Sequence, residues 1–287
     1  MLRGAKSLAV PVKFGQSLQI ERIDEQNVLY WQSKEFGKTW FEAKIKLESF
    51  QIEHTSDDTI GSKLLSVLKE ARNLNSSFLS DGRAFKCETN LNFNRKWGLG
   101  SSSTLLSLIA EWSKCDVYEL LKNTFGGSGY DVACAQSAGP LTYQIVNNMA
   151  VVNQINFKPD FRKNICFVFL GKKQQTDQEI KRFNSESIIS KFEVEQISNL
   201  TNDIINAYSQ GDFNESLTKH EKITASVIKR IPIKDERFAD FNGEIKSLGA
   251  WGGDFIMVSS LMNREETMAY FESKGLSTIL SYDDMVL

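Results

Sequence analysis

The feature that most constrains the fold is a glycine-serine run at residues 97–104, Trp-Gly-Leu-Gly-Ser-Ser-Ser-Thr. Before it, residues 85–93 alternate apolar and polar side chains with a period of two, which is typical of a strand. After it, the leucine-rich residues 104–113 predict a largely buried helix. The chain therefore passes from a strand to a helix through a turn in which two glycines allow another group to approach the backbone closely.

Such a turn can bind phosphate. The start of a helix offers free N–H donors and the positive end of its dipole, and serine hydroxyls add donors or ligate a metal. Serine is also a favoured N-cap, so the run alone is equally compatible with an ordinary capped helix start. The pattern G-x-x-x-x-G-K-[ST] is absent from residues 97–104, which excludes a P-loop there.

A second glycine cluster, residues 126–129, precedes Tyr130 and Asp131. We expect a short helix of small residues over 131–137. A carboxylate at its start can accept a proton from a hydroxyl nucleophile or orient a magnesium ion. An aspartate that merely caps the helix is the alternative reading of Asp131.

A third cluster, residues 246–254 (Lys-Ser-Leu-Gly-Ala-Trp-Gly-Gly-Asp), lies before an apolar strand expected over 255–260. Glycines at the end of a strand can let the chain fold over a ligand, and they can equally mark a plain turn. Taken by itself this cluster favours neither reading.

The rest of the chain mixes strands and helices without strict alternation, which predicts an α+β fold with a boundary near residues 156–163. Further strands are expected at residues 7–12, 17–23, 28–32, 39–46, 141–146, 150–155, 165–170 and 277–281. Further helices are expected at 60–74, where residues 56–58 would cap the start, and at 117–122, 190–208, 240–248 and 265–274.

Composition excludes several classes. The chain has 287 residues, 41% hydrophobic and 24% charged, which is a globular composition. Its 34 basic and 36 acidic residues lack the basic excess of a nucleic-acid or membrane-surface protein. The four cysteines form no C-x-x-C pair, and no long apolar stretch resembles a membrane span or signal peptide, so we expect reduced thiols and a cytoplasmic location.

Histidine is scarce. The two histidines, His54 and His220, are too few for a multi-histidine metal centre and argue against a Ser-His-Asp triad. Because polar residues surround His220 in the sequence, we expect it on the surface.

Together and in this order, the three glycine-bearing segments resemble the GHMP kinases (galactokinase, homoserine, mevalonate and phosphomevalonate kinases). That family binds ATP phosphates with G-L-G-S-S-A-A, supplies an active-site aspartate from S-G-x-D, and closes a K-x-S-G-A-G-G-G loop over the ligands. The resemblance spans residues 97–254 and is greatest to phosphomevalonate kinases, which carry K-T-G-L-G-S-S, G-S-G-F-D-V-A and G-A-G-G-G-D.

The resemblance implies roles for individual residues. Asp131 would be the catalytic base or an orienting carboxylate, and Ser102 the magnesium ligand. The ATP phosphates would lie on Gly98, Leu99, Gly100, Ser101, Ser102 and Ser103. The substrate and closing loops would comprise Gly127, Ser128, Gly129, Lys172, Lys173, Thr176, Gly249, Ala250, Gly252 and Gly253. For the two lysines, a solvated loop is an equally good reading.

The resemblance also implies a two-domain GHMP kinase fold. An N-terminal ATP-binding domain like ribosomal protein S5 domain 2 would span residues 1–158, and a ferredoxin-like domain residues 159–287. The implied activity is transfer of the γ-phosphoryl group of ATP, with Mg²⁺, to phosphomevalonate or a similar small molecule. The protein would be a monomer or homodimer, with no nucleic-acid or membrane partner. Alternatives are mevalonate or another hydroxyl acceptor, or a catalytically silent member that binds a nucleotide or metabolite.

Three departures from the family pattern bear on activity. The family's first motif, P-G-K-(apolar)-x-G-E, is not found. Residues 2–9 resemble the segment that follows this motif in the family. We therefore expect the chain to begin late and to lack one strand and a lysine that the family places beside the transferred phosphate. Trp251 stands where the closing loop has glycine, and Leu248 where it has serine. These departures support the silent alternative.

Overall fold

The computed structural model describes residues 1–171, 182–183, 189–249 and 254–287. By its internal contacts the chain forms two compact units. The first unit comprises residues 14–95 and 99–136, and the second comprises residues 1–13, 96–98 and 137–287. The predicted domain boundary at residues 158 and 159 stays a prediction.

The first unit is built on a five-stranded sheet of order β2-β6-β3-β4-β5. All neighbouring strands are antiparallel except β3 and β6, which are parallel. The strands are β2 (Gln16–Gln26), β3 (Val28–Glu35), β4 (Lys38–Lys46), β5 (Gln51–Thr55) and β6 (Arg83–Leu91). Four of them lie where the sequence predicts a strand, whereas β5, which is mostly exposed and polar, was missed.

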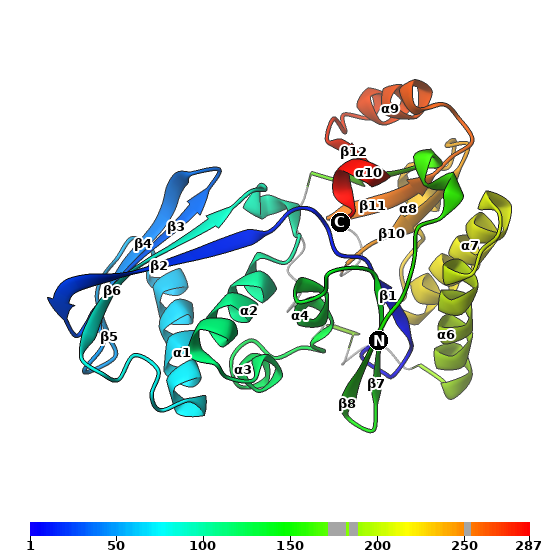
Figure 1. Cartoon of the computed structure of the whole chain (residues 1–287). Coiled ribbons are helices and arrows are strands. Elements are labelled where there is room, and N and C mark those ends of the chain that lie inside the picture. The colour runs from blue at the N-terminus through cyan, green and yellow to red at the C-terminus, as the bar shows by residue number, and fades with distance from the viewer. Residues whose placement is uncertain (172–181, 184–188, 250–253) are drawn as a thin grey trace. The chain divides into compact units, whose positions relative to one another are not determined.

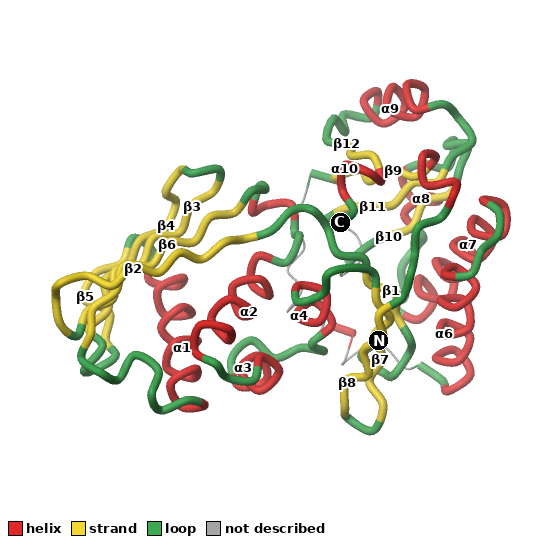
Figure 2. Tube along the Cα trace, in the orientation of Figure 1, coloured by secondary structure: helices red, strands yellow, loops and turns green. Residues whose placement is uncertain are grey.

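Helices α1 (Asp58–Leu74) and α2 (Ser101–Ser113) pack on one face of this sheet (Figures 1 and 2). Helices α3 (Val117–Asn123) and α4 (Tyr130–Ala135) pack against α2. The predicted cap of α1 is confirmed, because the Asp57 side chain accepts the N–H of Ile60. Apolar side chains of the sheet and of α1 and α2 form one buried core, which includes Trp31, Leu68 and Ile109. This core fixes the direction in which α2 leaves the glycine-serine run.

The second unit contains a three-stranded antiparallel sheet of order β1-β7-β8. Its strands are β1 (Ser7–Ala9), β7 (Leu141–Val146) and β8 (Met149–Gln154). Helix α6 (Lys191–Ile205) begins with a capping box at Ser190, packs on α7 (Gln210–Val227) and is also joined to β1. The joining bonds run from the backbone N–H of Lys6 to Ser198 Oγ, and from Thr201 Oγ1 to Lys6 O, each 3.0 Å long.

The second sheet of this unit has four antiparallel strands in the order β10-β11-β9-β12. They are β9 (Ile165–Phe169), β10 (Glu244–Ser247), β11 (Phe255–Ser259) and β12 (Ile279–Ser281), accompanied by helices α8 (Ile233–Arg237), α9 (Arg264–Ser273) and α10 (Tyr282–Met285). Taken in chain order, the first and third strands are central and the second and fourth lie at the edges. This is the strand order of a ferredoxin-like sheet.

The helix predicted over residues 240–248 is wrong, because residues 244–247 form the strand β10. Ile245 and Ser247 are buried, whereas Glu244 and Lys246 alternate with them and form ion pairs with Lys234 and Glu221. Alternation over four residues is too short a signal to distinguish a strand from a helix in the sequence.

Within the residues that the structure describes, none of the helices combines the length and apolar character needed to cross a lipid bilayer.

Candidate functional site

The glycine-serine run forms the start of α2. Gly100 adopts a left-handed conformation with φ of 81°, and α2 begins at the next residue. No side chain of the described residues caps this end, whereas α1, α3, α6 and α7 are each capped by a side chain. The first N–H groups of a helix have no partner within the helix, so the start of α2 can donate to an anion.

The serines lie on the first turn of α2 rather than in a loop before it. Ser102 is exposed, and Ser101 and Ser103 are half-buried. One residue later, Thr104 Oγ1 is 2.9 Å from Gln16 Oε1 of β2, and the Thr104 N–H donates to Gly100 O at 3.0 Å. The bond to Gln16 attaches the first turn of α2 to the sheet. The helix predicted from residue 104 therefore starts three residues earlier, because glycine supplies the left-handed turn at position 100.

The second motif has the same construction. Gly127 and Gly129 have φ of 100° and 82°, and Gly129 directly precedes α4. Asp131, in the first turn of α4, is exposed. Helix α4 packs against α2 within the first unit (Figure 1). The predicted phosphate-binding serines and the predicted catalytic aspartate thus lie on the first turns of two helices that contact each other.

The carboxylate of Asp131 influences its neighbours. Burial, with a smaller contribution from the negative charge of Asp131, raises the pKa of the Cys134 thiol to about 12. Burial also raises the pKa of Tyr130, with smaller contributions from Cys134 and Asp131. Both Cys134 and Tyr130 are therefore neutral near pH 7.

The third motif connects β10 to β11. Ser247 faces Ile256 in the antiparallel ladder of β10 and β11, and the Leu248 N–H donates to Phe255 O at 3.3 Å. Gly249 has a left-handed φ of 60°. This connection is the predicted closing loop.

Within the second unit, residues 97 and 98 of the first motif contact residues at the end of the third motif. Gly98 lies against the carboxylate of Asp254, and a Cβ on Gly249 would lie 3.5 Å from Asp254 Oδ2. Trp97, at the end of the short 3₁₀ helix η1 (Arg95–Trp97), contacts the rings of Phe169 and Phe255 at centroid distances of 6.5 and 5.7 Å. Residues 97 and 98 are thus held at the ends of β9 and β11.

Six predicted site residues lie outside the described residues. They are Lys172, Lys173, Thr176, Ala250, Gly252 and Gly253. Trp251, whose departure from the family pattern bears on the closing loop, is outside them as well. The roles of all these residues stay predictions.

Sequence reasoning missed a buried network beside the closing loop. Glu221 of α7 accepts from Lys246 Nζ at 2.7 Å and from the Ser247 N–H at 3.2 Å. The expectation that His220 lies on the surface is wrong in part, because the residue is half-buried and its Nδ1 is 3.2 Å from Thr224 Oγ1. Burial, helped by the charge of Lys246, lowers the His220 pKa to about 3. Lysine and glutamate 25 residues apart give no local signal of such a pair.

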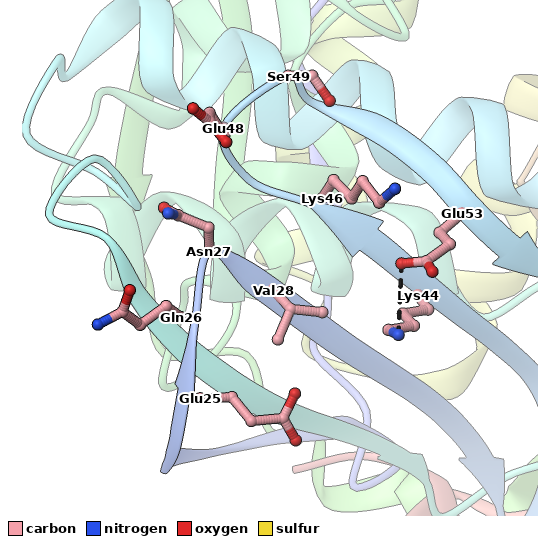
Figure 3. Close-up of a pocket in the computed structure, with 9 residues that line it drawn as sticks. All are labelled: Glu25, Gln26, Asn27, Val28, Lys44, Lys46, Glu48, Ser49 and Glu53. Carbon is pink, nitrogen blue, oxygen red and sulfur yellow. Dashed lines mark ion pairs between the residues drawn. The ribbon is translucent and has the colours of Figure 1, made fainter.

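The first unit also contains two surface hollows. One, of about 400 Å³, lies among residues 25–53 and includes the Lys44–Glu53 ion pair at 3.3 Å (Figure 3). It contains no residue of the three motifs. The other, of about 810 Å³, is lined by residues 107–118, 135 and 136. It adjoins later turns of α2 and the end of α4, not their first turns.

The donor set fits a magnesium-bound nucleotide better than a metal held by protein alone. Among the described residues no group of three or more histidine, cysteine, aspartate or glutamate side chains could hold a metal ion. Mg²⁺ in phosphoryl-transfer sites is usually held by one or two protein oxygens together with substrate phosphates and water. The exposed hydroxyl of Ser102 and the exposed carboxylate of Asp131 are oxygens of this kind.

No protein-family model matches the sequence, and no curated protein sequence matches it either. Solved structures do share its fold. Mevalonate kinase of Methanococcus jannaschii is 15% identical, with a TM-score of 0.69, and the match covers 97% of this chain and 91% of that one.

Two further structures extend the comparison. Phosphomevalonate kinase of Streptococcus pneumoniae, in complex with phosphomevalonate and AMPPNP, is 13% identical with a TM-score of 0.64, covering 96% of this chain and 98% of that one. D-glycero-D-manno-heptose 1-phosphate kinase of Bacteroides thetaiotaomicron is 16% identical with a TM-score of 0.65, covering 99% and 88%. The predicted α+β fold is confirmed: over nearly its whole length the chain has the two-domain fold of the GHMP kinases.

Proposed function

We propose that this chain is an ATP-dependent small-molecule kinase that transfers the γ-phosphoryl group to phosphomevalonate or a similar acceptor. The observation that carries the proposal is the start of α2, an uncapped helix end entered through a left-handed glycine and bearing three serines. In a fold shared with kinases, residues 98–102 match the first five positions of the G-L-G-S-S-A-A motif, which supports the proposal.

In the proposed reaction the phosphates of ATP lie on residues 98–103, with the N–H groups of the first turn as donors. Ser102 is the protein ligand of Mg²⁺, whose charge offsets that of the phosphates. Residues 249–253 close over the nucleotide, and residues 127–129 with Lys172, Lys173 and Thr176 contact the acceptor. Catalysis consists chiefly of positioning and charge stabilisation, as for phosphoryl transfer in general.

The acceptor decides what Asp131 has to do. An oxygen of the acceptor bonds to the γ-phosphorus while the bond from that phosphorus to the β–γ bridging oxygen breaks, and ADP leaves. A hydroxyl acceptor must lose its proton, and Asp131 would accept it. A phosphate acceptor is largely ionised near pH 7, because its second pKa is about 6. With phosphomevalonate, Asp131 would therefore orient the acceptor or the metal rather than act as a base.

The test is ADP release from ATP and Mg²⁺ with phosphomevalonate, mevalonate, homoserine and heptose 1-phosphate as separate acceptors. We expect turnover with phosphomevalonate to exceed that with the others. Loss of turnover in Asp131→Asn would support its place in the site, with about a 100-fold fall expected for a hydroxyl acceptor that needs a base. Unchanged turnover in this variant would remove Asp131 from the reaction.

A matched control is Asp58→Asn. Asp58 is also an exposed aspartate in the first turn of a helix, but α1 is not entered through a glycine motif. Its replacement should leave turnover within twofold of wild type. Binding of ATP without turnover of any acceptor would instead favour the catalytically silent alternative.

A further inference from the structure

Asp254 occupies a fixed place at the end of the four-stranded sheet. It directly precedes β11, and its backbone oxygen accepts the N–H of Leu170, just after β9, at 2.9 Å. Only 9% of the residue is exposed. A carboxylate so far removed from water persists only where donors or charges compensate it, so its position is set by its surroundings.

The first glycine of the phosphate-binding run, Gly98, lies against this carboxylate. A Cβ built on Gly98 would lie 2.8 Å from Asp254 Oδ2 and closer still to Oδ1 and Cγ. Real Cβ atoms do not approach a carboxylate this closely, so another residue fits here only if the Asp254 side chain or the backbone shifts. Gly98 also has φ of 72°, which side chains disfavour.

Other glycines of the motifs differ in this respect. A Cβ on Gly100 would meet nothing within 4 Å, although its φ of 81° is similar. A Cβ on Gly249 would be in ordinary contact with Asp254 Oδ2, at 3.5 Å. Close packing against Asp254 is therefore specific to Gly98, whereas the left-handed backbone is common to all three positions.

The neighbour of Gly98 is anchored to the same sheet. The Trp97 ring stands edge-on to Phe255 at an interplanar angle of 88° and also contacts Phe169. Phe255 follows Asp254 directly. Trp97 and Gly98 are therefore held by two consecutive residues at the start of β11. The beginning of the phosphate-binding run and the end of the closing loop thus form one contact.

We infer that Asp254 is a positioning residue that seats the beginning of the phosphate-binding run, and that position 98 requires glycine because of this carboxylate. Like charges repel, so a polyphosphate does not share the space of a buried carboxylate. This narrows the proposed phosphate-binding residues from 98–103 to 100–103, beyond Gly98. The identity of the ligand rests on the proposed function. The coupling of Asp254 to Gly98 can be measured in the protein without any ligand.

The first experiment is a set of unfolding midpoints in urea for Asp254→Ala in three backgrounds: wild type, Gly98→Ala and Gly100→Ala. In wild type and Gly100→Ala we expect Asp254→Ala to lower the midpoint. In Gly98→Ala it should raise the midpoint, because removing the carboxylate gives the added methyl group room. Gly100→Ala is the matched control, since it introduces backbone strain without the contact. An equal fall in all three backgrounds would overturn the inference.

The second experiment uses Asp254→Asn, which keeps the shape of the side chain and removes its charge. We expect the KM for MgATP to rise about tenfold, the difference between a charged and a neutral acceptor, with kcat within twofold of wild type. A lower kcat at unchanged KM would contradict a role in positioning the phosphates. If wild type neither binds nor turns over MgATP, the proposed function fails, and the midpoints alone decide whether Asp254 seats Gly98.

Discussion

Glu221 and Lys246 form a buried ion pair that joins α7 to β10. Lys246 Nζ lies 2.7 Å from Glu221 Oε2, and the two side chains are only 12% and 4% exposed. Lys246 Nζ also donates to Ser247 O at 2.8 Å, and Glu221 Oε1 accepts the Ser247 N–H. The strand that leads into the predicted closing loop is therefore held to α7 through both a side chain and its backbone.

Breaking this pair should cost far more than breaking an exposed one. We expect Glu221→Gln to lower the free energy of unfolding by about 3 kcal/mol, because it leaves a buried ammonium without its counter-charge. The matched control is Glu215→Gln on the same helix, whose partner Lys219 is exposed, with an expected change within about 0.5 kcal/mol. Urea unfolding of both variants measures the difference. Equal effects would show that burial does not govern the Glu221–Lys246 pair.

His220 should make stability depend on pH. Its pKa is lowered to about 3 in the folded chain, from an ordinary value of 6.5, by burial and by the charge of Lys246. Between these values the unfolded chain binds a proton that the folded chain does not. Stability is therefore fully present above pH 6.5 and falls as the pH is lowered, by about 1.4 kcal/mol per pH unit from this group.

The measurement is the free energy of unfolding in urea, for wild type and His220→Asn, at pH values from 7.5 to 4.5. The difference between the two proteins isolates His220, because the contributions of carboxylates that titrate in the same range are common to both. The variant should lose stability less steeply as the pH falls. His54→Asn, at an exposed position on β5, should retain the wild-type slope. A His220→Asn slope equal to that of wild type would contradict the buried, neutral imidazole.

Local patterns predicted much of the fold. The strand expected at residues 141–146 has the bounds that β7 shows, and the acidic start of α1 marks its cap at Asp57. Strand β10 could not be predicted, because Glu244 and Lys246 are held by ion pairs with Lys234 and Glu221 elsewhere in the chain. Local signals report the neighbours of a residue along the chain, not those across the fold.

In the candidate site, too, local features could be predicted and long-range contacts could not. Its glycines were recognised as motifs in the sequence, because left-handed turns before helices restrict the choice of residue. The reason that position 98 is glycine was not visible, because it depends on the carboxylate of Asp254, far along the sequence. His220 was misplaced on the surface for the same reason: its polar neighbours in the sequence do not indicate that β10 contributes a charge beside its ring.

Trp97 should contribute to stability through its contacts with Phe169 and Phe255. We expect Trp97→Ala to lower the free energy of unfolding by about 2 kcal/mol, because the half-buried ring loses both apolar contact and edge-to-face packing. Trp97→Phe, which keeps an aromatic ring there, should cost less than about 1 kcal/mol. Urea unfolding followed by circular dichroism measures both. Equal losses in the two variants would show that the aromatic contacts are not what holds Trp97.

Ser102 should determine how much magnesium the proposed reaction needs. Its exposed hydroxyl lies on the first turn of α2, beyond the uncapped helix start. If Ser102 ligates Mg²⁺, Ser102→Ala should raise the Mg²⁺ concentration that gives half-maximal ADP release about tenfold at saturating ATP. Ser102→Thr retains a hydroxyl and should therefore keep most of the affinity for Mg²⁺. Ser107→Ala is the control, because Ser107 Oγ donates to Ser103 O one turn along the same helix and should leave magnesium dependence unchanged. An unaltered magnesium requirement in Ser102→Ala would assign the metal to the phosphates and Asp131 instead.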